Sequence, residues 1–167
     1  MSKRAPIIRQ TAWPMVIPQL VFLVVAIFIA VSLTEMPSVG LILGAGATLA
    51  YSFGARALLA GAHQRGMRLI RQGRYAEAVE AFQASYDFFS RHPWVDRLRA
   101  FILMMASPAS YREMALLNAA FCYGQMGKWG RAREVYERVI EEFGDTSGIA
   151  ARTLRVLDAA ERVQKKA

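Results

Sequence analysis

The sequence predicts an all-α protein in which an apolar helical hairpin precedes a helical domain. Hydrophobic residues make up 54% of the 167 residues and charged residues only 20%, and the apolar excess is concentrated in residues 13–62. After residue 62 the apolar residues recur with the 3.6-residue period of helices. One short sequence pattern also occurs twice: RQGRYAEAVEAF (71–82) and QMGKWGRAREVY (125–136) share a Gly, an aromatic, an Ala and an aromatic at the same offsets.

Two uncharged segments predict a pair of transmembrane helices. Residues 13–33 carry no charged side chain over about the length that an α-helix needs to cross a bilayer. Residues 39–55 are also uncharged and lie near the lower limit for a span, and we expect this helix to run on through residue 62 into the next helix. Because the connector TEMPS (34–38) is so short, the two helices must form an antiparallel hairpin with both outer ends on one side.

A cleaved signal peptide is the alternative for the first segment. Ala30 and Ser32 form a small-x-small site after a basic start. The apolar core would be unusually long for a signal peptide, however, and a second apolar segment follows at once. We therefore expect an anchor that stays in the membrane.

Basic residues predict which side of the membrane the flanks occupy. Residues 1–12 are basic, and five arginines follow the second segment before the first acid, Glu77: Arg56, Arg65, Arg68, Arg71 and Arg74. The positive-inside rule then places residues 1–12 and the helical domain, 63–167, in the cytoplasm of a multi-pass inner membrane protein. The excess of Arg over Lys is typical of a bacterial chain. The net charge of +8 fits attraction to an anionic leaflet better than nucleic-acid binding.

The helical domain begins with two helices, an insertion and two further helices. Residues 63–72 and Tyr75 to Arg91 form the first pair, separated by Gly73. Pro93 opens an inserted helix over residues 94–106. Its apolar stripe, which we expect to pack on the neighbouring helices rather than on the membrane or a partner, is Trp94, Leu98, Phe101, Ile102 and Met105.

The second pair starts at a capping box, Ser110 with Glu113, and runs to about Met126. Gly127 breaks it, residues 129–143 form the partner helix, and Gly144 is its expected C-cap. A last helix over about 147–164 closes the domain.

These two pairs, roughly residues 59–93 and 113–146, resemble tetratricopeptide repeats. The residues at family positions are Gly66, Leu69, Gly73, Tyr75, Ala78 and Phe82 in the first pair and Ala120, Tyr123, Gly127, Trp129, Ala132 and Tyr136 in the second. The family implies small residues at the helix crossing and bulky ones in the gap to the next helix. Gly73 and Gly127 lie farther apart than the family's period of about 34 residues, because the inserted segment separates the pairs.

The resemblance implies protein binding in a groove lined by the first helix of each repeat. Carried over by position, that groove comprises His63, Gln64, Met67, Ile70, Arg71, Met114, Leu117, Asn118, Phe121 and Gln125, with Arg152 on the last helix. Asn118 and Arg152 match positions that hold a C-terminal carboxylate in chaperone-binding members. His63, Met67 and Gly148 replace the Lys, Asn and Lys of that clamp, so we expect a mixed apolar and polar groove.

Small residues on the second apolar segment predict helix packing inside the membrane. Gly40 and Gly44 recur every four residues on one face, and Gly46, Ala50 and Gly54 do so on another. One face can serve the hairpin, and the other is available for another membrane protein or a second copy of this chain. The frequency of glycine in membrane helices is an equally good explanation of the pattern.

No residue pattern indicates catalysis, a metal or a cofactor. His63 and His92 lack ligand spacing with Cys122 or a carboxylate, and Cys122 lies among apolar residues, where an inert buried thiol is expected. LGAGA (43–47) lacks the Lys and the preceding strand of a phosphate loop. We therefore predict a non-enzymatic membrane-tethered adaptor, with an accessory or assembly subunit of an integral membrane complex as the alternative.

Overall fold

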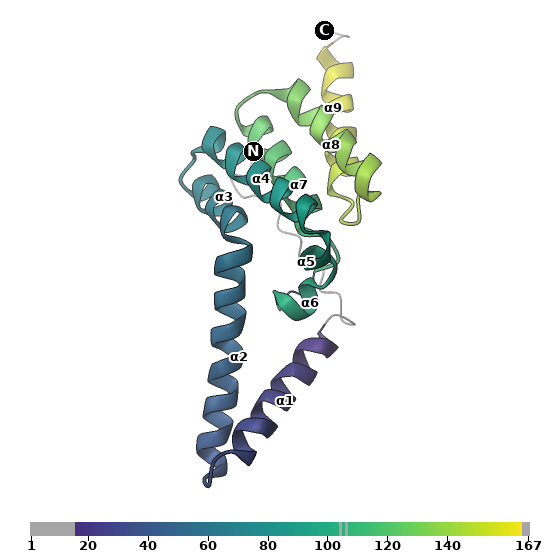
Figure 1. Cartoon of the computed structure of the whole chain (residues 1–167). Helices are drawn as coiled ribbons and strands as arrows, with labels where there is room; N and C mark the ends of the chain where they lie inside the picture. The colour runs from purple at the N-terminus through teal and green to yellow at the C-terminus, as the bar shows by residue number, and fades with distance from the viewer. Residues whose placement is uncertain (1–15, 104, 106, 165–167) are drawn as a thin grey trace. The chain divides into compact units, whose positions relative to one another are not determined.

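The computed structural model describes residues 16–103, 105 and 107–164, and the regular elements in that part of the chain are all α-helices (Figure 1). The predicted all-α class is confirmed. The helices fall into two compact units: α1, α2 and the inserted segment 94–107 form one, whereas residues 62–93 and 108 onward form the other. The basic residues of 1–12, the start of the first predicted span at 13–15, positions 104 and 106 of the insertion, and Lys165 to Ala167 lie outside the described residues.

The first unit is built on an antiparallel hairpin of α1 (Ile17–Ser32) and α2 (Pro37–Leu59). Glycine allows the two backbones to approach closely. A Cβ atom on Gly40 would lie 2.5 Å from Cα of Val31, and one on Gly44 would lie 2.5 Å from Cα of Ile27. Larger residues at these two positions would force the helices apart.

Helix α2, with 23 residues, is long and apolar enough to cross a membrane. The 16 described residues of α1 are also apolar but form a shorter helix. The expectation that α2 continues into the following helix is wrong: α2 ends at Leu59, Ala60 leaves helical geometry at φ −107° and ψ 18°, and α3 (Gly61–Arg71) begins after it. Glycine is a weak helix former, which favours a break at this point.

The second unit contains α3, α4 (Tyr75–Arg91), α7 (Tyr111–Gln125), α8 (Trp129–Phe143) and α9 (Ile149–Gln164). The turn between α3 and α4 has the same geometry as the turn between α7 and α8. Gly73 and Gly127 have φ of 75° and 73°, a region that favours glycine. The N–H of Arg74 donates to Leu69 O at 3.0 Å, and that of Lys128 donates to Tyr123 O at 2.9 Å. The repeated sequence pattern thus encodes the same interhelical turn twice.

Small residues lie where the helices of each pair cross. Ala78 and Ala132 are fully buried, beside the bulky Phe82 and Tyr136. At Gly66 an added Cβ would stand 2.7 Å from Cε1 of Phe82, so the ring occupies the space that a side chain would need. This arrangement of small and large residues is the one that the resemblance implied.

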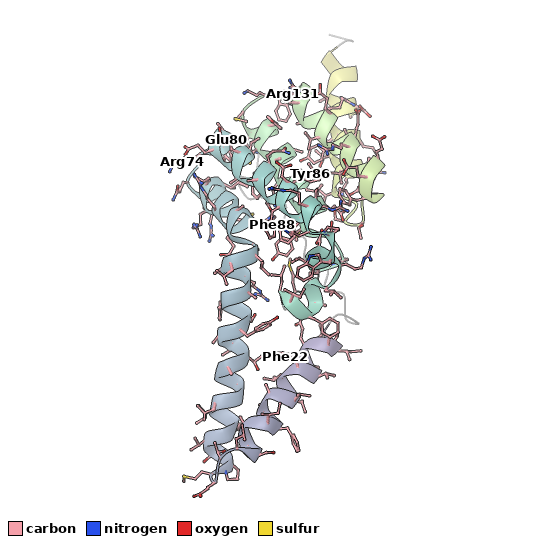
Figure 2. The ribbon with its side chains drawn as sticks, viewed as in Figure 1. Phe22, Arg74, Glu80, Tyr86, Phe88 and Arg131 are labelled. Atoms are coloured by element: carbon pink, nitrogen blue, oxygen red, sulfur yellow. The ribbon has the colours of Figure 1, made fainter. Side chains whose placement is uncertain are left out.

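The two helical pairs are joined through Tyr86 on α4 (Figure 2). Its hydroxyl donates to Oε2 of Glu142 at 2.7 Å and accepts from Nη2 of Arg138 at 2.8 Å. The Arg138 guanidinium also lies over the Tyr86 ring, 4.7 Å from its centroid. Tyr86 packs against both hydrophobic clusters of the unit, so it links α4 to α8 by apolar and polar contacts together.

Two acidic residues take part in the caps of α7 and α9. The N–H of Glu113 donates to Oγ of Ser110 at 3.1 Å, as a capping box requires. Burial raises the pKa of the Glu113 carboxyl, and hydrogen bonds from Thr146 and from the backbone of Ser147 and Ser110 oppose that shift. At α9, Asp145 accepts from the N–H groups of Ala150 and Ala151 and caps the helix, a role that the sequence did not reveal.

The inserted segment forms two short helices, α5 (Pro93–Arg97) and α6 (Arg99–Ile102), instead of one amphipathic helix over 94–106. The prediction of which apolar residues are buried is also wrong, because Val95, Ala100 and Leu103 are the ones buried among the described residues of the segment. Trp94, Leu98 and Phe101 are exposed. The guanidinium of the buried Arg99 donates to the carbonyls of Asp96 and Ser107, and these bonds help to hold the bent segment together.

Candidate functional site

The first helices of the two pairs, α3 and α7, lie beside each other. At their N-terminal ends the rings of His63 and Tyr111 meet edge to face, with centroids 5.2 Å apart. Farther along, Leu69 and Ile70 of α3 share one hydrophobic cluster with α4 and with three residues of α7: Ala115, Ala119 and Cys122. The two helices therefore pack against each other through a shared apolar cluster, as the predicted groove requires.

The eleven residues predicted to line this groove differ in how far their side chains are buried. Four are buried, namely Ile70, Met114, Leu117 and Asn118. Five are half-buried, namely His63, Gln64, Met67, Phe121 and Gln125, whereas Arg71 and Arg152 are exposed. Leu117 packs in the cluster that includes Ala132 and Tyr136 of α8, so it supports α7 from inside.

The half-buried residues give the α3 and α7 surface an apolar centre. Met67 and Phe121 both pack against the cluster shared by the two helices. The Phe121 ring also meets Tyr75 edge to face at a centroid distance of 6.5 Å. Gln64, Arg71 and Gln125 add polar groups along the same two helices, so the surface offers both apolar contact and hydrogen bonding.

His63 is held in an apolar environment that keeps it neutral. Its ring meets Phe82 at 5.3 Å and Tyr111 at 5.2 Å, both edge to face. Burial lowers the pKa of His63 from 6.5 to about 4. One polar atom, Oγ of Ser85, lies 3.5 Å from Nδ1. A neutral imidazole between two rings serves packing rather than recognition of an anion.

Sequence reasoning missed Tyr111, the first residue of α7. It stacks on Phe89 with centroids 4.5 Å apart and contacts His63, so it connects α4, α7 and α3. The only signal in the sequence was an aromatic residue placed directly after the helix cap Ser110. The same reasoning treated Tyr75 as a framework residue, although it contacts Phe121 on the candidate surface.

Arg152 lies on α9, apart from the helices that carry the other groove residues. It borders a shallow pocket of about 330 Å³ together with Ile149, Thr153 and Val156. Its Nε donates to Gly148 O at 3.4 Å. Because Asn118 is buried and Arg152 is exposed, the two residues differ sharply in access to a ligand.

The small-residue faces of α2 differ in what they contact. Gly40 and Gly44 are buried against α1. A Cβ at Gly46 or Gly54 would meet nothing within 4 Å, and Ala50 between them is exposed. Among the described residues, then, helix packing within the chain uses the face of Gly40 and Gly44.

Residues 114–146 match the tetratricopeptide repeat family. The match covers α7, α8 and the turn between them, which carries Gly127. This helical pair is therefore similar to a tetratricopeptide repeat, and repeats of this family bind other proteins and are typically non-catalytic. No curated protein and no solved structure matches the chain.

Metal binding and a nucleophilic thiol each place requirements on the described residues. Within that part of the chain there is no group of three His, Cys, Asp or Glu residues that could hold a metal ion. Cys122 is fully buried, and burial raises the pKa of its thiol to about 12. A thiol with such a pKa carries almost no thiolate at neutral pH.

Proposed function

We propose that this chain is a membrane-anchored protein-interaction module. The observation that carries the proposal is the apolar surface of the α1–α2 hairpin. Phe28 of α1 is 71% exposed and Phe53 of α2 is 69% exposed, and bulky aliphatic side chains around both helices are exposed as well. Exposure of such an apolar surface to water is unfavourable, and contact with lipid acyl chains removes it from water.

Charge supports a cytoplasmic position for the repeats. The stretch of α2 between Glu35 and Arg56 is uncharged, and exposed arginines follow it on α3: Arg65, Arg68 and Arg71. We infer a two-span inner membrane protein with both termini in the cytoplasm, in which residues 13–62 form the anchor and 63–167 the cytoplasmic domain. A reporter that fluoresces only in the cytoplasm, fused after Ala167, should be fluorescent. Activity of a periplasmic reporter at the same position would reverse the orientation.

The partner of the repeats is inferred to be a peptide or helix of another protein. The α3 and α7 surface supports this, because Met67 and Phe121 provide an apolar centre and Gln64, Arg71 and Gln125 surround it with polar groups. Such a mixture suits an amphipathic segment better than a free carboxylate. The buried residues Ile70, Met114, Leu117 and Asn118 would then shape the surface from below.

A pull-down from mild detergent, with the retained proteins identified by mass spectrometry, tests this surface. Gln125→Arg places a long charged side chain on the surface and should lower the amount of specific partner at least about tenfold, a loss of about 1.4 kcal/mol. Gln83→Arg makes the same change at an exposed position of α4 and should retain the partner. Equal retention by both variants would reject the α3 and α7 surface as the binding site.

The free glycine face of α2 favours a second candidate, an accessory or assembly subunit of an integral membrane complex. Gly46, Ala50 and Gly54 would let another membrane helix approach closely, from a different protein or from a second copy of this chain. Gly46→Leu with Gly54→Leu should then remove integral subunits from the pull-down. Loss of partner in this variant with full retention in Gln125→Arg would favour the accessory subunit over the adaptor.

A further inference from the structure

The inserted segment 94–107 is folded around a buried arginine. Nη1 of Arg99 donates to Asp96 O at 3.0 Å, while Nη2 and Nε donate to Ser107 O at 2.9 and 3.3 Å. These bonds tie the last turn of α5 to the end of the segment and satisfy a charge that would otherwise be costly to bury. The segment is thus a compact structure with a fixed inside and outside.

The outside of this compact segment is apolar. Trp94, Leu98 and Phe101 are 58%, 45% and 53% exposed, whereas Val95 and Leu103 are buried. Among the exposed residues of the two short helices, Arg97 is the charged one. The short segment therefore exposes three large apolar side chains, as segments that contact a membrane or another molecule do.

The segment is attached to the hairpin where the hairpin's apolar stretch ends. Nε of Arg56 on α2 donates to Leu103 O at 2.7 Å, and α6 contacts α1. Arg56 is the first charged residue after Glu35, so it marks the place where α2 would leave the hydrocarbon of a bilayer. Leu103, bonded to Arg56, is therefore at the depth of the lipid headgroups.

We propose that α5 and α6 form an interfacial docking element, in which Trp94, Leu98 and Phe101 enter the headgroup and upper acyl region of the bilayer that holds the hairpin. This inference rests on the membrane anchoring proposed above. Tryptophan is favoured at membrane interfaces, and Arg97 can remain among the lipid phosphates. The partner is lipid rather than protein because the segment is attached to the hairpin where its apolar stretch ends, through the Arg56–Leu103 hydrogen bond and the contact of α6 with α1.

Tryptophan quenching by brominated lipid tests the proposal on the full chain. In a protein carrying Trp13→Phe and Trp129→Phe, Trp94 is the remaining tryptophan. When this protein is reconstituted in phosphatidylcholine and phosphatidylglycerol vesicles, the emission of Trp94 should be blue-shifted. Lipids brominated on the acyl chain should reduce the intensity of that emission at least about twofold. The matched control carries Trp13→Phe and Trp94→Phe and reports Trp129, which is 44% exposed on α8 and should not be quenched.

The outcomes separate this inference from the anchoring on which it rests. If the chain resists alkaline extraction from the vesicles but Trp94 is no more quenched than Trp129, the docking element is overturned and the anchor stands. If alkaline treatment strips the chain from the vesicles, both are overturned.

A nitroxide spin label provides a second test that leaves every tryptophan in place. The label is attached to the cysteine of Leu98→Cys in a Cys122→Ala background. If this position lies in lipid, the label should collide more often with oxygen than with a water-soluble nickel complex, and more frequent collisions with nickel would overturn the docking element.

Discussion

Replacing Ala78 by Leu tests whether the close helix crossing defines the repeat fold. Ala78 is fully buried in the cluster that joins α3, α4 and α7, with Leu69, Ile70 and Phe82 as cluster neighbours. No surface is free at this position, so the added isobutyl group must displace one of these side chains or move α3 away from α4. Overpacking of this kind typically costs about 1–3 kcal/mol.

The assay is thermal unfolding of the full chain in a mild detergent, followed by far-UV circular dichroism. In a unit of this size, each kcal/mol lowers Tm by about 4–8 °C, so Ala78→Leu should lower the transition by at least about 4 °C. Ala76→Leu is the matched control, since it makes the same change at an exposed position of the same helix. Glu80→Ala, also on the exposed side of α4, should cost about half a kcal/mol or less.

The reasoning is refuted if Ala78→Leu and Ala76→Leu both melt at the temperature of the unmodified chain. Equal melting would mean that α3 and α4 separate at no cost, and a crossing fixed by a small residue would no longer explain the fold. A loss in both variants would instead point to a general effect of leucine on α4. Only a loss confined to Ala78→Leu supports the packing described above.

Three further outcomes are expected. Because the pKa of His63 is lowered to about 4, only the unfolded chain gains a proton at this residue as pH falls from about 6.5 to 4. The free energy of unfolding should therefore decline by at most about 3 kcal/mol over that range. In melts at several pH values, His63→Phe should remove this part of the pH dependence. Gly44→Leu should abolish cross-linking between cysteines engineered on α1 and α2, whereas Gly46→Leu should leave it intact; equal loss would contradict the packing. Cys122 should react with a maleimide only after denaturation, and rapid labelling of the native chain would show that α7 opens.

Local rules made much of the repeat unit predictable from the sequence. The starts of α4 and α8 follow from Gly73 and Gly127, because glycine readily takes the positive φ of those turns and the apolar period resumes directly afterwards. The cap of α7 follows from Ser110, whose hydroxyl accepts the N–H three residues later. Each of these features depends on residues close in sequence, so no tertiary information was needed.

The candidate binding surface was predictable in outline only. Repeat spacing identified α3 and α7 as its helices, but it could not distinguish Leu117, buried under α8, from Gln125, which stays accessible. That distinction depends on how far α8 and α9 cover α7, a property of packing between distant segments. For the same reason Tyr75 and Tyr111 joined the surface only once their ring contacts were known.

By itself, the sequence determined that the chain is helical, that an apolar hairpin precedes a repeat-like unit, and where most of the helices of that unit begin and end. The tertiary structure alone decided that segment 94–107 bends in two, joins the hairpin and turns Trp94 and Phe101 outward. Periodicity would have placed those aromatic residues inside. The folded segment instead buries the Arg99 guanidinium, which donates to the carbonyls of Asp96 and Ser107, because a charge removed from water needs hydrogen-bond partners and local periodicity does not encode them.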